Sequence, residues 1–261
     1  MAHQSTPYDI DRLRATLAAA GMERVEYRQV TGSTNRDLHD LLRGDEPLAN
    51  HAVILADQQT AGRGRLGRVW SAPPATQLIA SIAITHVDPQ RIGTLPLACG
   101  VGIVTALREL TGLPVRLKWP NDVILTGADG YHKLSGILGE VVGEQALIGF
   151  GVNHLLTAED LPVPTATSLL LEGIDIDRTT LAEGVLTHVA HWLTRWEEDT
   201  FDLDAYRQVC ATVGQSVRAL LPGGEAITGT ATDITTGGDL VIVTGRGDSV
   251  TVSAGDVEHL R

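Results

Sequence analysis

Aromatic residues are scarce in this chain: Phe, Trp and Tyr together make up 4% of its 261 residues. The core must therefore be aliphatic and built mainly from Val, Leu, Ile and Ala. Cysteine is equally rare, with Cys99 and Cys210 far apart in apolar or helix-like contexts and outside any CxxC or Cys/His ligand spacing. This pattern excludes a disulfide framework and a cysteine-built zinc site, and we expect two buried free thiols in a reducing cytosol.

The chain also lacks the signals of export and of membrane insertion. No charged segment followed by an apolar stretch opens it, and no apolar run reaches the roughly 18–20 residues that span a bilayer. We therefore expect a cytoplasmic protein with no membrane partner. Basic residues are outnumbered as well: 20 Lys and Arg face 32 Asp and Glu, for a net charge of −12. Such a balance argues against broad nucleic-acid binding, so a phosphate site here must be a local basic island.

What is present is ordinary for a globular protein, with 43% hydrophobic and 20% charged residues. Apolar periodicity predicts helices over residues 10–20, 36–42, 95–110, 178–198 and 203–213. It predicts strands over residues 25–30, 51–56, 77–85, 115–118, 123–125, 134–142 and 146–152. Residues 31–35 are predicted to form a loop whose hydroxyls cap the helix that follows.

The pattern changes at Gly214. Short alternating runs over residues 216–220, 226–234, 240–244 and 250–252 are separated by glycine-rich turns, and we expect five short strands in about fifty residues. These features predict two domains. Residues 1–213 form an α+β domain with a mixed, mostly antiparallel sheet and flanking helices, and residues 214–261 form a small SH3-like all-β barrel.

The strongest motif is a glycine- and arginine-rich segment, Gln59-Thr60-Ala61-Gly62-Arg63-Gly64-Arg65-Leu66-Gly67-Arg68-Val69-Trp70. Glycines let a backbone approach a ligand closely, and arginines bind carboxylate or phosphate at two points. A solvated basic turn is the alternative. The segment follows a predicted buried strand in an acidic protein, which favours an anion site. The phosphate loop GxxxxGK[ST] is absent, and no GxGxxG opens a helix after a strand, so the nucleotide-binding motifs of those folds do not apply.

Two further motifs contain lysines. Lys118-Trp119-Pro120-Asn121-Asp122 places an ammonium, an amide and a carboxylate on one proline-stiffened turn, and Mg²⁺ commonly takes one or two carboxylates plus substrate phosphates. Lys133-Leu134-Ser135-Gly136-Ile137 places a lysine at the start of an apolar strand. Taken singly, each motif also fits an ordinary turn or strand start.

Together the three motifs, with Gly32-Ser33-Thr34-Asn35 and Gly149-Phe150-Gly151-Val152-Asn153, resemble the biotin–protein ligase family in order and in content. The resemblance runs from about residue 30 to the C-terminus and includes the final barrel. It is to the monofunctional type, without an N-terminal DNA-binding domain. The chain departs from the family at Ser135, where alanine is common, in a somewhat long turn between Asp122 and Lys133, and at His154.

The resemblance implies an ATP-dependent ligase. It would activate biotin as biotinyl-5′-AMP, release pyrophosphate, and transfer biotin to a lysine in the biotin carboxyl carrier domain of an acyl-CoA or pyruvate carboxylase. Lys133 would lie between the biotin carboxylate and the α-phosphate, Lys118 would reach the outer phosphates, and Arg65 would be the main anion contact. Asp122 would help to hold Mg²⁺.

The same resemblance implies a set of residues around biotin and ATP. Ser33, Thr34 and Gln59 would hydrogen-bond the ureido ring, and Gly62, Gly64 and Gly136 would lie close to it. Asn121 and Asn153 would contact the adenine or the metal shell. The full implied binding set is Ser33, Thr34, Asn35, Gln59, Gly62, Arg63, Gly64, Arg65, Arg68, Trp70, Asn121, Lys133, Gly136, Ile137 and Asn153.

Three other functions are compatible with parts of this pattern. A lipoate or octanoate ligase or transferase shares the fold, but the transferase type needs a paired Lys/Cys site, and neither cysteine lies near the motifs. A bifunctional repressor carries a winged helix of about 60 residues ahead of the catalytic domain; here about 30 residues with one predicted helix precede Thr31. A biotin-storing protein would bind biotin without ATP.

Overall fold

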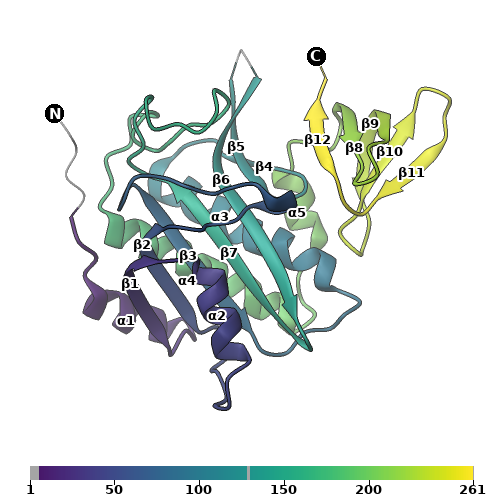
Figure 1. Cartoon of the computed structure of the whole chain (residues 1–261). Helices are drawn as coiled ribbons and strands as arrows, with labels where there is room; N and C mark the ends of the chain where they lie inside the picture. Colours follow the sequence, from purple (N-terminus) through teal and green to yellow (C-terminus); the bar gives the residue numbers. More distant parts are fainter. Residues whose placement is uncertain (1–5, 128–129, 261) are drawn as a thin grey trace.

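The computed structural model describes residues 6–127 and 130–260, and within them a seven-stranded sheet carries the larger part of the chain (Figure 1). Its strand order is β1-β2-β3-β7-β6-β5-β4, with β1 and β2 parallel and the other neighbours antiparallel. The strands are β1 (Val25–Thr31), β2 (Val53–Gln59), β3 (Gln77–Ile84), β4 (Arg116–Lys118), β5 (Asp122–Gly127), β6 (Gly130–Val142) and β7 (Gln145–Asn153). The predicted mixed, mostly antiparallel sheet is confirmed.

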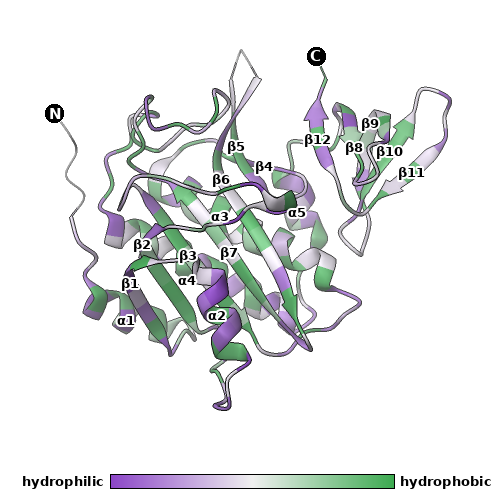
Figure 2. Cartoon of the chain, viewed as in Figure 1, coloured by the Kyte–Doolittle hydropathy of each residue, from purple (hydrophilic) through white to green (hydrophobic). Residues whose placement is uncertain are grey.

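Helices cover both faces of this sheet. They are α1 (Ile10–Ala19), α2 (Thr34–Leu42), α3 (Leu95–Thr111), α4 (Arg178–Glu197) and α5 (Leu203–Val209), with 3₁₀ turns at Arg65–Gly67 and Ile92–Thr94. The main aliphatic core lies between the sheet and the layer of α1, α3 and α4, whereas α2 packs on the opposite face. Because both faces are covered, β3 is buried along its whole length, which explains why its residues other than Gln77 and Ser81 are apolar (Figure 2).

Helix α3 is a core helix although it is long and apolar. The segment Ile92–Thr111 passes a length and composition test for a membrane span, and 67% of it is buried inside the fold. Gly102 lets α3 approach α4 closely, because a Cβ there would lie 2.7 Å from the Cα of Val189. The aliphatic composition is therefore used for helix–helix packing.

The predicted cap of the second helix is wrong. Helix α2 starts at Thr34, two residues before the predicted start, and Ser33 occupies its N-cap without a side-chain hydrogen bond. The hydroxyls bind elsewhere: Thr31 Oγ1 donates to Asp37 Oδ2 at 2.6 Å, and Thr34 contacts residues of the neighbouring strands. Helix α5 also ends at Val209, earlier than the predicted residue 213.

The C-terminal sheet has five antiparallel strands in the order β11-β10-β9-β8-β12. They are β8 (Ser216–Leu220), β9 (Ala226–Ile234), β10 (Leu240–Thr244), β11 (Ser249–Val252) and β12 (Asp256–His259), and the sequence pattern had located the first four. This sheet docks on the larger domain through the buried Trp119, whose Nε1 donates to the carbonyl of Gly238 at 2.9 Å. Arg207 Nε adds a bond of 2.7 Å to Asp233.

Candidate active site

A cavity of about 440 Å³ opens between the sheet, the glycine- and arginine-rich loop, the segment 162–166 and strand β12. Of the residues predicted for the site, Gly62 alone does not line it. Those that do are Ser33, Thr34, Asn35, Gln59, Arg63, Gly64, Arg65, Arg68, Trp70, Lys118, Asn121, Asp122, Lys133, Gly136, Ile137 and Asn153. Motifs separated by more than a hundred residues in sequence therefore line the same cavity.

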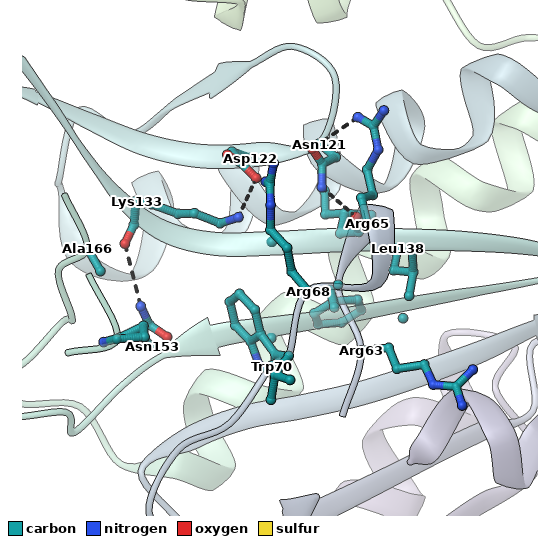
Figure 3. Close-up of a pocket in the computed structure, with 18 of the residues that line it drawn as sticks. Arg63, Arg65, Arg68, Trp70, Asn121, Asp122, Lys133, Leu138, Asn153 and Ala166 are labelled. Atoms are coloured by element: carbon teal, nitrogen blue, oxygen red, sulfur yellow. Dashed lines mark hydrogen bonds and ion pairs between the residues drawn. The ribbon is translucent and has the colours of Figure 1, made fainter. Parts of the chain in front are cut away.

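Lys133 and Asp122 form an ion pair at its centre, with Nζ 2.6 Å from Oδ1 (Figure 3). They lie on the neighbouring strands β6 and β5. The backbone of Lys133 is fixed from the other side, because its N–H donates to the carbonyl of Thr165 at 2.7 Å and its carbonyl accepts from Thr167 N. The ammonium is thus held rigidly at the cavity wall.

Lys118 is buried, and its Nζ lies 5.0 Å from the centre of the Tyr131 ring. Burial lowers the pKa of this lysine, partly offset by the charge of Asp122. Within residues 6–127 and 130–260 its ammonium makes no hydrogen bond or ion pair, so its donors are available to an anion in the cavity.

The three arginines of the loop take different positions. Arg65 is largely covered, with Nη1 3.3 Å from Asn121 Oδ1 and Nη2 3.4 Å from the carbonyl of Gly255. Arg68 forms an ion pair with Asp256 of β12. Arg63 extends away from the Lys133–Asp122 pair (Figure 3). Two of the three arginines thus tie the loop to the C-terminal domain.

Trp70 lies flat against glycines at the base of the loop. Its Nε1 donates to Gln77 Oε1 at 3.1 Å, and a Cβ on Gly151 would lie 2.6 Å from this nitrogen. A Cβ on Gly136 would lie 3.1 Å from both the indole and Lys133 Nζ. Glycine at 136 and 151 therefore makes room for the indole itself.

Gly62 does not line the cavity, and its contact with the ligand stays a prediction. A Cβ there would lie 2.3 Å from the carbonyl of Trp70, and Trp70 N donates to the carbonyl of Gly62 at 3.0 Å. Gly62 instead lets the two ends of the loop pair with each other, next to the bridge between Arg63 and Val69.

The two asparagines are engaged with the protein. Asn121 Nδ2 donates to the carbonyl of Ile137 at 2.9 Å. Asn153 Nδ2 donates to the carbonyl of Thr167 at 2.8 Å, and its Oδ1 accepts from Gln77 Nε2 at 2.7 Å. Contact of either amide with adenine or with a metal shell stays a prediction.

Some lining residues were missed from the sequence. Among them are Ser81, Tyr131, residues of the segment 162–166 and the start of β12 with Asp256, Val257 and Glu258. None carries a local motif, since each reaches the cavity only through tertiary packing. The two cysteines are buried and free, as predicted, and neither lines the cavity. His154 is also buried, and its Nε2 lies 2.8 Å from the carbonyl of Ile176.

Comparisons with known proteins indicate the family of this chain. Residues 27–153 match the model of the biotin/lipoate A/B protein ligase family, and residues 212–260 match that of the biotin protein ligase C-terminal domain. A biotin–[acetyl-CoA-carboxylase] ligase of Mycobacterium tuberculosis is 38% identical over 98% of this chain and 97% of its own. The bifunctional ligase/repressor of Escherichia coli is 33% identical over 65% of this chain and 57% of its own.

A solved structure shows the same fold. The biotin protein ligase of Aquifex aeolicus in complex with biotin and ATP superposes with a TM-score of 0.76 and is 26% identical. The match covers 91% of this chain and all of that one. It therefore includes both the seven-stranded domain and the C-terminal sheet.

Proposed function

The chain belongs to the biotin/lipoate A/B protein ligase family and acts as a biotin–protein ligase, and we propose that the cavity described above is where both of its steps take place. Biotin is activated with ATP as biotinyl-5′-AMP, pyrophosphate leaves, and biotin passes to a lysine of a biotin carboxyl carrier domain. The observation that carries the proposal is the gathering of Lys118, Lys133, Arg65 and Arg68 around one cavity in a chain of net charge −12.

The first step needs charge neutralisation. The biotin carboxylate is already ionised at neutral pH, so it attacks the α-phosphate without a general base, and the obstacle is an anion meeting an anion. Fixed cations in a partly water-excluded cavity lower that barrier most effectively. We assign Lys133 to the carboxylate and α-phosphate, Lys118 to the outer phosphates, and Arg65 to the adenylate anion. The buried Lys118 and the ion-paired Lys133 support this assignment.

Biotin recognition is assigned to the opposite end of the cavity. Its ureido ring offers two N–H donors and one carbonyl acceptor. Ser33, Thr34 and Gln59 supply matching hydroxyl, amide and backbone groups there, and all three line the cavity. Gln59 Oε1 already accepts from Thr34 N at 2.8 Å, which fixes its orientation.

Magnesium fits this site only together with substrate. The described part of the chain holds no cluster of three or more His, Cys, Asp or Glu that could bind a metal alone. Asp122 contributes one carboxylate, and Mg²⁺ accepts such an arrangement when phosphate oxygens complete its shell. Bound there, the ion would neutralise phosphate charge. Asp122 would then divide its oxygens between the ion and Lys133.

The second step needs an uncharged amine. The acceptor lysine has an ordinary pKa of about 10.4, so it must lose its proton at the site. We propose a carrier domain of an acyl-CoA or pyruvate carboxylase as the acceptor, supported by the name of the 38% identical relative.

We also propose a cytoplasmic location, supported by the two free thiols. We propose a domain boundary at residues 213–214, supported by the change from the seven-stranded sheet to the five-stranded sheet.

Biotin-dependent exchange of labelled pyrophosphate into ATP tests the first step without any carrier. We expect exchange with biotin and Mg²⁺, and none when lipoate or octanoate replaces biotin. Exchange with lipoate alone would move the chain to the sister activity. Tight biotin binding without exchange would indicate a biotin-storing protein.

A further inference from the structure

Beneath the cavity floor, a chain of side-chain hydrogen bonds runs from the molecular surface to the biotin end of the site. It begins at the exposed Glu140 of β6, whose Oε2 accepts from Asn35 Nδ2 at 2.6 Å. Ser81 Oγ donates to Asn35 Oδ1 at 2.6 Å, and the hydroxyl oxygens of Ser81 and Thr34 are 2.7 Å apart. Thr34 Oγ1 is also placed to donate to Gln59 Oε1 at 3.0 Å.

All members except Glu140 line the cavity, and Ser81 is fully buried. Gly149 leaves the space for the chain, since a Cβ there would lie 2.1 Å from Asn35 Oδ1. The arrangement thus connects an exposed carboxylate to two of the residues assigned to the ureido ring.

The carboxylate at one end determines which way each hydrogen bond points. An ionised carboxylate only accepts, so Asn35 must turn its NH₂ group to Glu140 and its oxygen to Ser81. The single hydroxyl proton of Ser81 is then committed to Asn35. The contact between Ser81 and Thr34 becomes a hydrogen bond only if Thr34 donates.

This order leaves the Thr34 hydroxyl with lone pairs and no spare proton. Gln59 Oε1 does not depend on that proton, because the backbone N–H of Thr34 serves it at 2.8 Å. Any ligand group beside Thr34 Oγ1 in the cavity therefore meets an acceptor. An N–H there gains a hydrogen bond, whereas an oxygen faces lone-pair repulsion and the cost of an unmade bond.

We propose that Glu140 is a positioning residue that fixes the hydrogen-bond polarity of the cavity floor and so selects ligands with an N–H beside Thr34. The inference rests on the proposed use of this end of the cavity for the ureido ring. Glu140 acts through Asn35 and Ser81 and does not touch the ligand.

Removal of the carboxylate allows the direction of these side-chain hydrogen bonds to reverse. Without its acceptor, the Asn35 amide can turn over and donate to Ser81, and Ser81 can donate to Thr34. The Thr34 hydroxyl, released from Ser81, can then donate to Gln59 Oε1 or to a ligand oxygen in the cavity. The floor then accepts a ligand oxygen as readily as an N–H. The loss is one of discrimination, which a purely structural role of Glu140 would not produce.

The test compares biotin with its two cyclic carbamate analogues, in each of which one ureido N–H is replaced by a ring oxygen. Calorimetry on the full chain gives the dissociation constants for wild type, Glu140→Ala and Glu140→Gln. Glu144→Ala, which removes an exposed carboxylate at the turn of the same hairpin, is the matched control. Michaelis constants for biotin and for ATP are measured in parallel.

We expect wild type to bind one carbamate at least about 100-fold more weakly than biotin, because a site built for an N–H rejects a group that lacks it. Glu140→Ala should shrink that ratio about 10-fold or more and weaken biotin itself up to about 10-fold, with the ATP Michaelis constant within about 2-fold of wild type. Glu140→Gln can donate as well as accept, so it no longer fixes the Asn35 amide and should lose part of the wild-type ratio, whereas Glu144→Ala should retain it.

An unchanged carbamate-to-biotin ratio in Glu140→Ala would overturn the inference, even if both ligands bind more weakly. A Glu144→Ala variant that shrinks the ratio as much as Glu140→Ala would also overturn it. Both results come from binding alone, so they are separate from the pyrophosphate exchange that tests the proposed function in wild type.

Discussion

Arg68 of the glycine- and arginine-rich loop forms an ion pair with Asp256 at the start of strand β12. This contact and the bond from Arg65 to the carbonyl of Gly255 join the loop to the C-terminal domain across the mouth of the cavity. From the sequence, the loop is a run of glycine and like charge. The structure shows that two of its three cations have partners before any substrate is bound.

Asp256→Asn should loosen this loop. The side chains of Arg68 and Asp256 are 60% and 32% exposed, so loss of the pair should cost less than about 1 kcal/mol of global stability. Amide hydrogen exchange over residues 63–69 should nevertheless become faster in the free protein, and biotinyl-AMP should slow it in both forms. Asp248→Asn, an exposed carboxyl elsewhere in the same sheet, is the control. Equal amide exchange rates in Asp256→Asn and wild type would contradict the claim that the Arg68–Asp256 ion pair restrains the loop.

Lys133→Ala should abolish most adenylation. The substitution removes the ammonium assigned to the α-phosphate, and we expect a loss of roughly 100-fold or more in biotin-dependent pyrophosphate exchange, about 3 kcal/mol of barrier. Transfer from pre-formed biotinyl-AMP to a carrier domain should be reduced less, since the acyl–phosphate bond already exists. A variant that forms the adenylate at nearly the wild-type rate would remove Lys133 from this role.

Trp119→Phe should weaken the docking of the C-terminal sheet. The indole is 1% exposed and its N–H donates to the carbonyl of Gly238, so phenylalanine leaves that carbonyl without its partner. We expect a loss of about 1–3 kcal/mol in chemical denaturation. Trp192→Phe, at a partly exposed position of α4, should change stability by less than about 1 kcal/mol. Equal effects of the two substitutions would argue against this bond as the anchor.

Features that depend on local sequence patterns could be predicted, whereas features that depend on tertiary packing could not. The hairpin of β6 and β7 and the residues of the three motifs were predictable, because strand period and residue chemistry are local. Gly62 lies outside the cavity lining because it pairs with Trp70, and in sequence a glycine that closes a loop looks the same as one that borders a ligand. Asp256, Glu258 and the segment 162–166 carry no local pattern, and only the docking of distant segments brings them to the cavity.

Acid should destabilise the interface between the two domains through His259. Burial, helped by the charge of Lys118, lowers the pKa of His259 to about 4, and its ring accepts or donates at 3.1 Å from Thr212 Oγ1. Since the pKa of a histidine in the unfolded chain is near 6.5, the neutral His259 ring contributes its full stabilisation above pH 6.5. That contribution, roughly 2 kcal/mol after solvent screening, should be lost as the pH falls toward 4.

The measurement is the difference in unfolding free energy between wild type and His259→Gln across pH 4–8. Glutamine keeps a polar partner for Thr212 but does not titrate. We expect wild type to lose stability relative to the variant between pH 6.5 and 4 and the two to run parallel above pH 7. Parallel curves over the whole range would contradict the pKa assignment.

The sequence contains two lysines, Lys118 and Lys133, and both line the cavity. An activated acyl-adenylate reacts with uncharged amines, and outside the cavity the sequence offers it no lysine side chain. Arg14→Lys, at a half-exposed position on α1, introduces one and serves as a positive control for unspecific labelling. The enzyme mass is thus an internal reference in any transfer assay.

Intact-mass analysis of a carrier domain, incubated with the enzyme, ATP, Mg²⁺ and biotin, tests the central claim most directly. The account predicts the mass of one added biotin on the carrier, dependent on both ATP and biotin, and none on a carrier whose acceptor lysine is replaced by arginine. A carrier mass that stays unchanged with biotin, or that increases with lipoate or octanoate instead, would contradict it.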